Sequence, residues 1–414
     1  MSRTRPRRTV SQHAAMTQRS PMRRLFTLIT AAVGAVALAA VGVGVFIVSD
    51  LAGAIQNNAV NIGTTTKPPA AELKAYDGAF NLLVVGTDEC ADSIRDFIGV
   101  DRCSGDEATH QLNDVNILIH VSEEPRRVTV LSFPRDLYTE IPGGEACSVE
   151  GTAKINTAYM SGGLACVKAA VDQLTGLNVD YAAKLSFLNV MQITDAIGGV
   201  EVCVGAGGIH DANTRVDLDP GMHKVKGGDA LQFLRTRYGL SGESDIARIS
   251  NQQQYMSRLV NKLRSEEVLT NPVTLLNLAT IVAHNMEPSK ELADPVRMAQ
   301  LALTIKDVPS DAITFVTFPV YDVSDGLAAS GDEADQLLTA IKNNEVFTLS
   351  RTGVGTTDPN AADPSEEPTT EDPVTEDPTP DPGSTTVPST KPVELGWGAS
   401  GQTAAQETCS NGNG

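Results

Sequence analysis

The sequence predicts an α/β domain, an α/β/α arrangement with a central mixed sheet flanked by helices, preceded by one transmembrane helix. A run of 24 residues without a charged side chain lies near the N-terminus. From Phe80 to about Leu349, short apolar runs alternate with segments of helical periodicity, which is typical of α/β domains. Two of the apolar runs are joined by only Ser-Glu-Glu-Pro-Arg, which favours an antiparallel hairpin and hence a mixed sheet.

The N-terminal segment predicts a single-pass anchor in the cell membrane. Residues 1–24 form a basic tail with seven arginines and no acidic residue, and residues 25–48 are the uncharged run. About 20 apolar residues cross the hydrocarbon core, and the arginines place the N-terminus in the cytoplasm and everything after Asp50 outside. The alternative is a cleaved signal peptide with its site at Ala37-Leu-Ala39. Residues 49–75, which contain turn formers and a Pro-Pro pair, predict a linker or stalk.

Residues 76–350 are predicted to form one extracytoplasmic domain, which is large enough for a single core. The expected strands are Phe80–Val85, Val115–Val121, Arg127–Phe133, Tyr181–Leu185, Val200–Val204 and Ile313–Pro319. The expected helices are 163–174, 187–197, 229–236, 245–265, 272–284, 295–304 and 332–343.

The composition changes at the C-terminus, where residues 351–414 are rich in Pro, Thr, Asp and Glu. Such a segment buries too little apolar surface to offset the entropy of ordering. We therefore predict a disordered tail. Its last residues include Trp397 and Cys409, which could pack or form a disulfide with the domain, so this end is an exception to the predicted disorder.

Charge and cysteine content restrict the function. Residues beyond the anchor carry 25 Lys and Arg against 51 Asp and Glu. This balance argues against nucleic-acid binding, which requires many basic contacts to phosphates. The six cysteines lie outside the membrane, where disulfides persist, and they lack the CxxC spacing of a zinc site. The pairs predicted to close short loops are Cys90–Cys103 and Cys147–Cys166, which leaves Cys203 and Cys409 as an optional third pair.

The helix predicted over residues 245–265 begins with polar groups beside its apolar stripe. At ~100° per residue, Asp245, Arg248 and Gln252 lie within roughly 60° of one another, along the edge of that stripe. Residues on the opposite side, namely Ser250, Gln254 and Arg258, are predicted to be solvated.

Burying an arginine without an anionic partner costs free energy. We therefore predict that an anion binds at the start of this helix. Arg235 and Arg237 precede the helix and add to the positive charge. The alternative is an internal Asp245–Arg248 ion pair with helix capping, although one aspartate does not satisfy three guanidinium groups.

Two more basic residues follow predicted strands or loops. Pro134 ends a strand and places Arg135 at the strand's C-terminal edge, where α/β proteins locate sites. Lys154 follows a glycine-rich loop bracketed by cysteines. Arginine guanidinium groups form paired hydrogen bonds to phosphate oxygens, and a lysine ammonium group adds a compact positive charge, so together they can bind a pyrophosphate. The alternatives are an ordinary Arg135–Asp136 turn pair and a solvated lysine.

Two carboxylates lie at the ends of neighbouring predicted strands. Asp88 follows the first strand and Asp114 opens the next. Such a pair can share Mg²⁺, which binds few carboxylates together with substrate phosphates. Each residue taken alone is more often a turn former or cap. The histidines show no metal-ligand spacing, and the G-x-S-x-G, Walker A and G-x-G-x-x-G signatures are absent.

The chain resembles the LytR–CpsA–Psr family of actinobacteria over residues 80–265. The matching stretches, in chain order, are Asn81–Asp88, Asn113-Asp114, Leu131–Asp136, Lys154–Tyr159, Asp195–Val200, Gly228–Arg237 and Asp245–Gln253.

The resemblance implies a transferase of cell-wall biogenesis. Such proteins move a glycopolymer from undecaprenyl pyrophosphate onto peptidoglycan, as a phosphodiester at the 6-hydroxyl of N-acetylmuramic acid. The residues implied to bind the pyrophosphate are Arg135, Lys154, Arg235, Arg237, Arg248 and Gln252. The residues implied in catalysis are Asp88, Arg135, Arg237, Asp245 and Arg248, with Asp88 preferred as the proton acceptor. Asp88 and Asp114 are implied ligands of Mg²⁺, with Mn²⁺ as the alternative. The polyprenyl chain is expected in an apolar pocket between the sheet and helices such as 187–197.

Departures from the family pattern leave other functions open. Leu112 and Cys90 occupy positions where the family often has arginine. The insert between the two aspartates holds Arg95 and Arg102, and a disulfide there would present one of them instead. Competing functions are a polyprenyl-phosphate-binding envelope regulator without transferase activity and a lipid pyrophosphatase.

Overall fold

The computed structural model describes residues 49–64, 72–87, 89, 111–359, 392–396 and 398–413. Nearly all of them belong to one compact unit, Leu51–Gly414. The predicted anchor at 25–48, the predicted Cys90–Cys103 pair and most of the predicted tail lie outside the described residues. Within these ranges, no helix has the length and apolar character needed to cross a bilayer.

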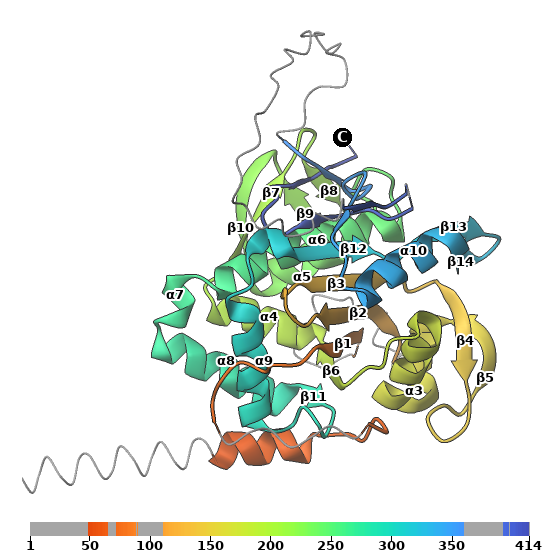
Figure 1. The fold of residues 1–414 in the computed structure, drawn as a ribbon. Helices are drawn as coiled ribbons and strands as arrows, with labels where there is room; N and C mark the ends of the chain where they lie inside the picture. The colour runs from red at the N-terminus through yellow and green to blue at the C-terminus, as the bar shows by residue number, and fades with distance from the viewer. Residues whose placement is uncertain are drawn as a thin grey trace, which may run out of the picture. The chain divides into compact units, whose positions relative to one another are not determined.

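A seven-stranded mixed sheet forms the centre of the domain, in the order β11-β6-β1-β2-β3-β12-β18 (Figure 1). Its strands are β1 (Phe80–Thr87), β2 (Asn113–Val121), β3 (Val128–Phe133), β6 (Tyr181–Ser186), β11 (Glu287–Pro288), β12 (Ile313–Thr317) and β18 (Gly401–Thr403). β1 is parallel to β6 and β3 is parallel to β12, whereas β1 with β2 and β2 with β3 are antiparallel. The predicted mixed sheet and its β2–β3 hairpin are confirmed.

Helices cover both faces of this sheet. They are α3 (Ala158–Thr175), α4 (Phe187–Ala196), α5 (Gly227–Arg235), α6 (Asp245–Leu263), α7 (Glu266–Leu269), α8 (Pro272–Asn285), α9 (Pro295–Lys306) and α10 (Gly331–Lys342). Each predicted helix corresponds to one of these. Local signals fix several starts: for example, Asn271 caps α8 by accepting from the backbone N–H groups of Val273 and Thr274, and proline follows at N1.

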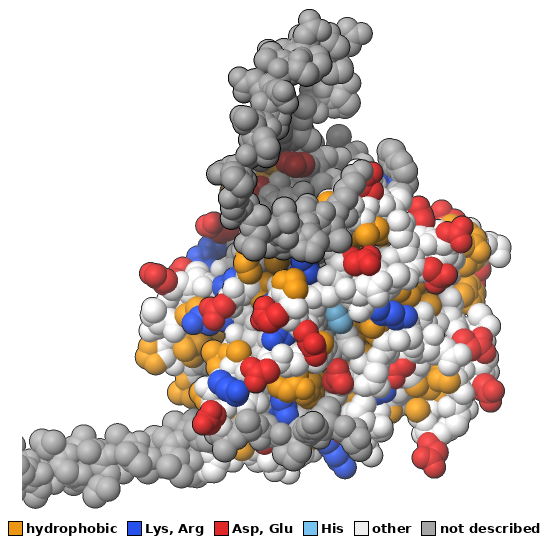
Figure 2. Space-filling view, viewed as in Figure 1, with side chains coloured by type: hydrophobic (Ala, Val, Ile, Leu, Met, Phe, Trp, Pro, Cys, Tyr) orange, Lys and Arg blue, Asp and Glu red, His pale blue; other side chains and the backbone are white. Residues whose placement is uncertain are grey.

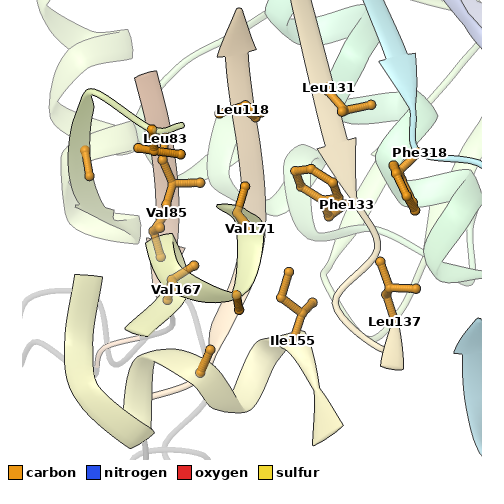
Figure 3. Close-up of a cluster of buried hydrophobic side chains, with 14 of the residues drawn as sticks. Leu83, Val85, Leu118, Leu131, Phe133, Leu137, Ile155, Val167, Val171 and Phe318 are labelled. Atoms are coloured by element: carbon orange, nitrogen blue, oxygen red, sulfur yellow. The ribbon is translucent and has the colours of Figure 1, made fainter. Parts of the chain in front are cut away.

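The core around the central sheet consists of two clusters, one on each face of the sheet, because successive side chains along a strand point to opposite faces. Leu83, Val85 and Leu118 point to one face, where Val167 and Val171 of α3 pack against them (Figure 3). The residues Phe80, Ile117, Val130 and Tyr181 belong to a second cluster, which includes Leu301 of α9. Burial on both faces explains the continuous apolar sequence of β3.

A second, four-stranded sheet has the order β10-β7-β19-β16. It consists of β7 (Val200–Val204), β10 (Gly221–Val225), β16 (Thr356–Thr357) and β19 (Cys409–Ser410). The strand predicted at Val200–Val204 is therefore present, in this smaller sheet. Short hairpins complete the fold: β4 (Tyr138–Pro142) with β5 (Glu150–Lys154), β8 (Ile209–Asp211) with β9 (Val216–Leu218), and β13 (Val320–Val323) with β14 (Gly326–Ala329).

Two disulfides occur among the described residues, and each joins two different elements. Cys147–Cys166, one of the predicted pairs, joins the β4–β5 loop to α3. Cys203–Cys409, which the sequence left optional, joins β7 to β19 across 206 residues.

The described C-terminal residues, 392–396 and 398–413, belong to the domain, so the prediction of a disordered tail is wrong for them. β18 pairs with β12, and β19 pairs with β16 and β7. Ala399, Ala404 and Ser410 are buried. Strand pairing and the Cys203–Cys409 disulfide hold this segment in place. Neither interaction can be recognised from the amino-acid composition of the segment. Part of the predicted linker is also packed, since Ile55 and Ile62 are buried.

Candidate functional site: an arginine-lined cavity

A cavity of about 540 Å³ opens between the central sheet and helices α4, α5 and α6. Its apolar wall includes Val84, Ile117, Phe187, Val190, Leu231 and Met256. Its polar wall includes Asp114, Arg135, Arg235, Arg237, Arg248 and Gln252. The cavity therefore brings together all but one of the predicted pyrophosphate-binding residues.

Arg248 is buried at the start of α6. Ser244 caps the helix by accepting from the Ala247 N–H at 3.1 Å, which fixes the first turn. Arg248 Nη2 lies 2.6 Å from Asp245 Oδ1 and donates to the Asp114 carbonyl oxygen at 3.3 Å. Burial lowers the pKa of Arg248, and the Asp245 and Asp114 charges oppose this while Arg135 and Arg237 add to it. The internal ion pair exists, and this buried cation has both acidic and basic side chains as neighbours.

Arg135 is held by three carboxylates at the end of β3. Its Nη1 donates to Asp114 Oδ1 at 3.0 Å, and its Nε lies 3.5 Å from Asp245 Oδ1 and 3.6 Å from Asp136 Oδ2. Burial works to lower the pKa of Arg135, but Asp114, Asp245 and Asp136 outweigh it and the pKa is raised. Asp245 thus contacts two arginines at once, Arg135 and Arg248.

Arg235 is the last residue of α5, and Arg237 lies on the segment between α5 and α6. The backbone N–H of Arg237 donates to Asp211 Oδ2 at 3.2 Å, and the Arg235 guanidinium carbon lies 5.3 Å from the centre of the Phe187 ring. The buried Nε atoms of Arg237 and Arg248 find no hydrogen-bond partner among the described residues. Unused buried donors are costly, and an anion in the cavity would satisfy them.

Asp211 is a cavity residue that sequence reasoning missed. Its carboxylate accepts from Thr236 Oγ1 at 2.7 Å, besides the Arg237 N–H, and so positions the segment that carries Arg237. Burial works to raise the pKa of Asp211, but these hydrogen bonds lower it overall. The sequence signal at Asp211, an Asp two residues before Asn213, indicates only a turn.

α6 is more deeply buried than its periodicity predicts. Gln252 lines the cavity and donates to the Leu234 carbonyl at 3.0 Å. The prediction that Ser250 and Gln254 face solvent is wrong, since both are buried. Gln254 Nε2 donates to the Cys203 carbonyl at 3.0 Å. The second sheet and the C-terminal segment cover this side of the helix.

Lys154 is not among the residues that line the cavity. Its Nζ lies 3.6 Å from Asp136 Oδ1 and 3.5 Å from Asp325 Oδ1, and 5.8 Å from the centre of the Tyr138 ring. The β4–β5 hairpin places Lys154 opposite Tyr138. The structure therefore connects Lys154 to Arg135 only through their shared contact, Asp136.

The predicted metal ligands are partly visible. Asp88 lies outside the described residues, but its neighbour Thr87 pairs with Asn113, next to Asp114. No group of three His, Cys, Asp or Glu suited to a metal occurs in the described part of the chain. Thr87 Oγ1 is buried and lacks a hydrogen-bond partner there. One carboxylate and one hydroxyl fit Mg²⁺, which takes most of its ligands from phosphates and water.

A second charge cluster, whose charged members are partly buried, lies beside β1. Lys184 Nζ contacts Glu89, the residue after Asp88, and lies 3.3 Å from Glu287 Oε2. Tyr159 OH donates to Glu287 Oε1 at 3.2 Å. Burial, followed by the Glu287 charge, raises the pKa of Tyr159 to about 12. The cluster secures the chain directly after β1.

Solved structures share this fold. Protein gbs0355 from Streptococcus agalactiae has a TM-score of 0.51 at 22% identity, over 64% of this chain and 87% of that one. A structure of TagT bound to LIIa-WTA has a TM-score of 0.51 at 19% identity, over 69% of this chain and 98% of that one.

Sequence relatives lead to the same group. The chain is 27% identical to the cell wall biosynthesis protein LcpA of Corynebacterium glutamicum, over 81% of this chain and 66% of LcpA. It is 25% identical to the polyisoprenyl-teichoic acid–peptidoglycan teichoic acid transferase TagT of Bacillus subtilis, over 52% of this chain and 66% of TagT. The chain thus spans just under two thirds of the length of each. Residues 45–343 match the model of one family, and on that match the chain belongs to the LytR_cpsA_psr family.

Proposed function

We propose that this protein is a membrane-anchored phosphotransferase of cell-wall assembly. In this proposal it moves a glycopolymer from undecaprenyl pyrophosphate onto the muramic acid 6-hydroxyl of peptidoglycan, as a phosphodiester. The single observation that carries the proposal is the cavity, which has four arginines at one wall and apolar side chains at the other. The names of LcpA and TagT, a cell wall biosynthesis protein and a teichoic acid transferase, support the same class of reaction.

The two walls of the cavity suit the two parts of such a lipid. The arginines would bind the pyrophosphate through charge-assisted hydrogen bonds, and the unused Nε donors of Arg237 and Arg248 are available for it. The polyprenyl chain would begin among Phe187, Val190 and Met256. The volume of about 540 Å³ lies within the range of small-molecule sites, ~300–1,000 Å³, so the site would hold the pyrophosphate and the first part of the chain.

In the proposed reaction, the 6-hydroxyl oxygen attacks the phosphorus that carries the glycopolymer. The bond from that phosphorus to the bridging oxygen breaks, and polyprenyl phosphate leaves with the bridging oxygen. We assign the hydroxyl proton to Asp88. Arg135, fixed by Asp114 and Asp245, and Arg237 would stabilise the negative charge that develops on the phosphoryl oxygens. Preorganised donors contribute more than mobile ones because they need not reorient during the reaction.

Asp114, Asp88 and Thr87 would hold the Mg²⁺ ion that the family resemblance implies. When bound, the ion would neutralise phosphate charge. The Arg135–Asp114 hydrogen bond of 3.0 Å would also tie this ligand to the anion-binding wall.

The test uses the full-length protein in detergent with Mg²⁺, a lipid-pyrophosphoryl sugar and peptidoglycan oligomers. Mass spectrometry should detect a sugar phosphodiester on muramic acid together with free polyprenyl phosphate. Retained lipid without product would favour a lipid-binding regulator. Sugar phosphate released into solution, with unmodified peptidoglycan, would favour a pyrophosphatase.

A further inference from the structure

The cavity continues past its arginines into a polar end. Arg248 and Leu259 of α6 both line the cavity, and the stretch of helix between them measures ~16 Å at 1.5 Å per residue. With the pyrophosphate at Arg248, the hydrocarbon chain would run along α6 towards Leu259. Asn213, Thr214 and Tyr238 also line the cavity, but they belong to the β8–β9 turn and to the loop that precedes α6. They therefore lie at the arginine end of the cavity.

One buried carboxylate, that of Asp211, joins this polar end to the arginines. Its Oδ1 accepts from the Asn213 N–H at 2.9 Å, and its Oδ2 accepts from the Arg237 N–H at 3.2 Å. Gly239 allows the loop after Arg237 to lie directly against β8, because a Cβ at this position would come within 2.9 Å of Asp211 Cβ. The Tyr238 carbonyl accepts a hydrogen bond from the C-terminal segment. The turn and Tyr238 are thus fixed relative to Arg237.

The side chains at the polar end are uncharged. Asn213 has an amide, Thr214 has a hydroxyl, and Tyr238 has a ring that is 52% exposed. The Asp211 carboxylate is already engaged by Thr236 Oγ1 at 2.7 Å and by backbone N–H groups. A few polar groups orient a ligand, and tyrosine adds a large, rigid contact area at low entropic cost. A sugar ring, which has hydroxyl groups and an apolar face, matches this set.

The charge of the domain favours an uncharged ligand at this end. Acidic residues outnumber basic ones in the sequence, with a formal net charge of -19, and acidic side chains are spread over the face that Figure 2 shows. A field of this sign repels an anionic polymer, except where the arginines gather. The side chains of Asn213, Thr214 and Tyr238 provide no cation for an acidic sugar.

We propose that Asn213, Thr214 and Tyr238 form a subsite for an uncharged sugar that is bonded to the pyrophosphate. The sugar hydroxyls hydrogen-bond to the amide and the hydroxyl, and the sugar ring stacks on Tyr238. The pyrophosphate of such a substrate lies between its hydrocarbon chain and its sugar, so a sugar at the polar end leaves the apolar wall to the chain. This inference rests on the proposed function and adds a substrate class, a glycopolymer whose first sugar is uncharged.

Calorimetric titration with two lipids tests the subsite. The first is a short, water-soluble polyprenyl pyrophosphate, and the second is the same lipid with N-acetylglucosamine on its pyrophosphate. The full-length protein in detergent should bind the second lipid more tightly. Tyr238→Ala and Asn213→Ala should each weaken binding of the second lipid by about fivefold, the order of one neutral contact, and leave binding of the first unchanged. The matched control, Tyr321→Ala, removes a tyrosine that is 56% exposed on β13 and is not among the cavity residues, and it should change neither affinity.

The possible failures of the subsite and of the proposed function differ. The subsite is wrong if the natural protein binds the two lipids equally, or if Tyr238→Ala weakens both to the same extent. In both cases binding of the sugar-free lipid by the natural protein still supports the anion site. If the natural protein binds neither lipid, the proposed function fails and the subsite fails with it.

A second pair of measurements decides which sugar occupies the subsite. The same lipid with glucuronic acid in place of N-acetylglucosamine should bind no more tightly than the sugar-free lipid, and a gain from the acidic sugar would contradict an uncharged subsite. The KM for peptidoglycan oligomers should be the same in Tyr238→Ala as in the natural protein. A raised KM for the oligomers together with unchanged affinity for the sugar-bearing lipid would assign the subsite to the acceptor and overturn the proposal.

Discussion

Arg237 and Arg248 line the same cavity but are held in different ways. Arg248 is buried in an ion pair with Asp245, with Nη2 2.6 Å from Oδ1. Among the contacts of Arg237 that the structure describes, the backbone hydrogen bond to Asp211 fixes its position, while its side-chain Nε has no hydrogen-bond partner in the described residues. We therefore expect Arg248 to contribute to folding as well as to the proposed binding, whereas Arg237 Nε remains as a donor for the proposed ligand.

We expect substitution of Arg237 to reduce activity and substitution of Arg248 to reduce stability as well. Arg237→Ala should reduce transfer by ~10²–10³-fold, as for loss of one preorganised donor, with little change in melting temperature. Arg248→Met should lower the free energy of unfolding by ~3 kcal/mol or more, because buried aspartates lose a partner. Thermal melts and the transfer assay check both. Full activity in Arg237→Ala, or an unchanged melting temperature in Arg248→Met, would contradict these roles.

A half-buried histidine gives a pH dependence of stability. Burial lowers the pKa of His120 from its ordinary value of 6.5, so the unfolded chain takes up this proton more readily than the folded one. Stability is therefore complete above pH 6.5 and is lost as the pH falls through the unfolded value towards the folded one. Chemical denaturation at pH 7 and pH 5 should show a larger loss for the natural protein than for His120→Asn. Equal losses would show that His120 does not contribute.

Sequence reasoning at the residue scale succeeded where one helix determines direction. Periodicity placed Arg248 and Gln252 beside the apolar stripe, and both line the cavity. It failed where other segments decide the environment. Gln254 is buried because residues far along the chain cover it, and Lys154 is turned towards Asp325 by a hairpin that was not predicted. Neither outcome is encoded in the neighbouring residues.

Among the elements, α6 depends on a segment beyond the family match, which ends at residue 343. Asn251 on α6 donates to the Phe233 carbonyl at 2.7 Å and accepts from Ser410 Oγ at 2.5 Å. The Ser241 N–H, in the loop between Arg237 and α6, donates to the Asn411 carbonyl at 2.9 Å. The C-terminal strand thus braces the loop and helix that carry the arginines.

Breaking this brace should weaken ligand binding as well as folding. Cys203→Ser with Cys409→Ser should lower the free energy of unfolding by ~2–5 kcal/mol, and should also reduce affinity for inorganic pyrophosphate under conditions where the protein is folded. The matched control, Cys147→Ser with Cys166→Ser, removes a disulfide whose cysteines do not line the cavity and should affect stability alone. Denaturation curves and calorimetric titration check both variants. Equal affinities in the two variants would argue against a brace.

Prediction of elements was accurate for the central sheet because each strand has its own apolar pattern, as at Val128–Phe133. It missed the second sheet as a unit. Val200–Val204 reads as a strand, but its partner Cys409–Ser410 has only two residues and lies over 200 positions away. Pairing at that distance depends on tertiary packing and a disulfide, which local patterns do not contain.

At the scale of the whole molecule, an acidic chain encloses a cavity rich in arginine. The sequence has a formal net charge of -19, yet four arginines line one cavity together with Asp114 and Asp211. Because the arginines outnumber the aspartates in this lining, the cavity of an otherwise acidic domain favours an anion. The opposite wall of the same cavity is apolar, with Phe187, Val190 and Met256 among its residues. We propose that the arginines bind the pyrophosphate of the substrate and that the apolar wall holds its hydrocarbon chain.

A crystal structure of the protein with a short-chain polyprenyl pyrophosphate tests this claim most directly. We expect phosphate oxygens within ~3 Å of the guanidinium groups of Arg237 and Arg248, and the hydrocarbon chain between Phe187 and Met256. A pyrophosphate bound elsewhere with the cavity free of ligand, or a chain that runs away from α4, would contradict it.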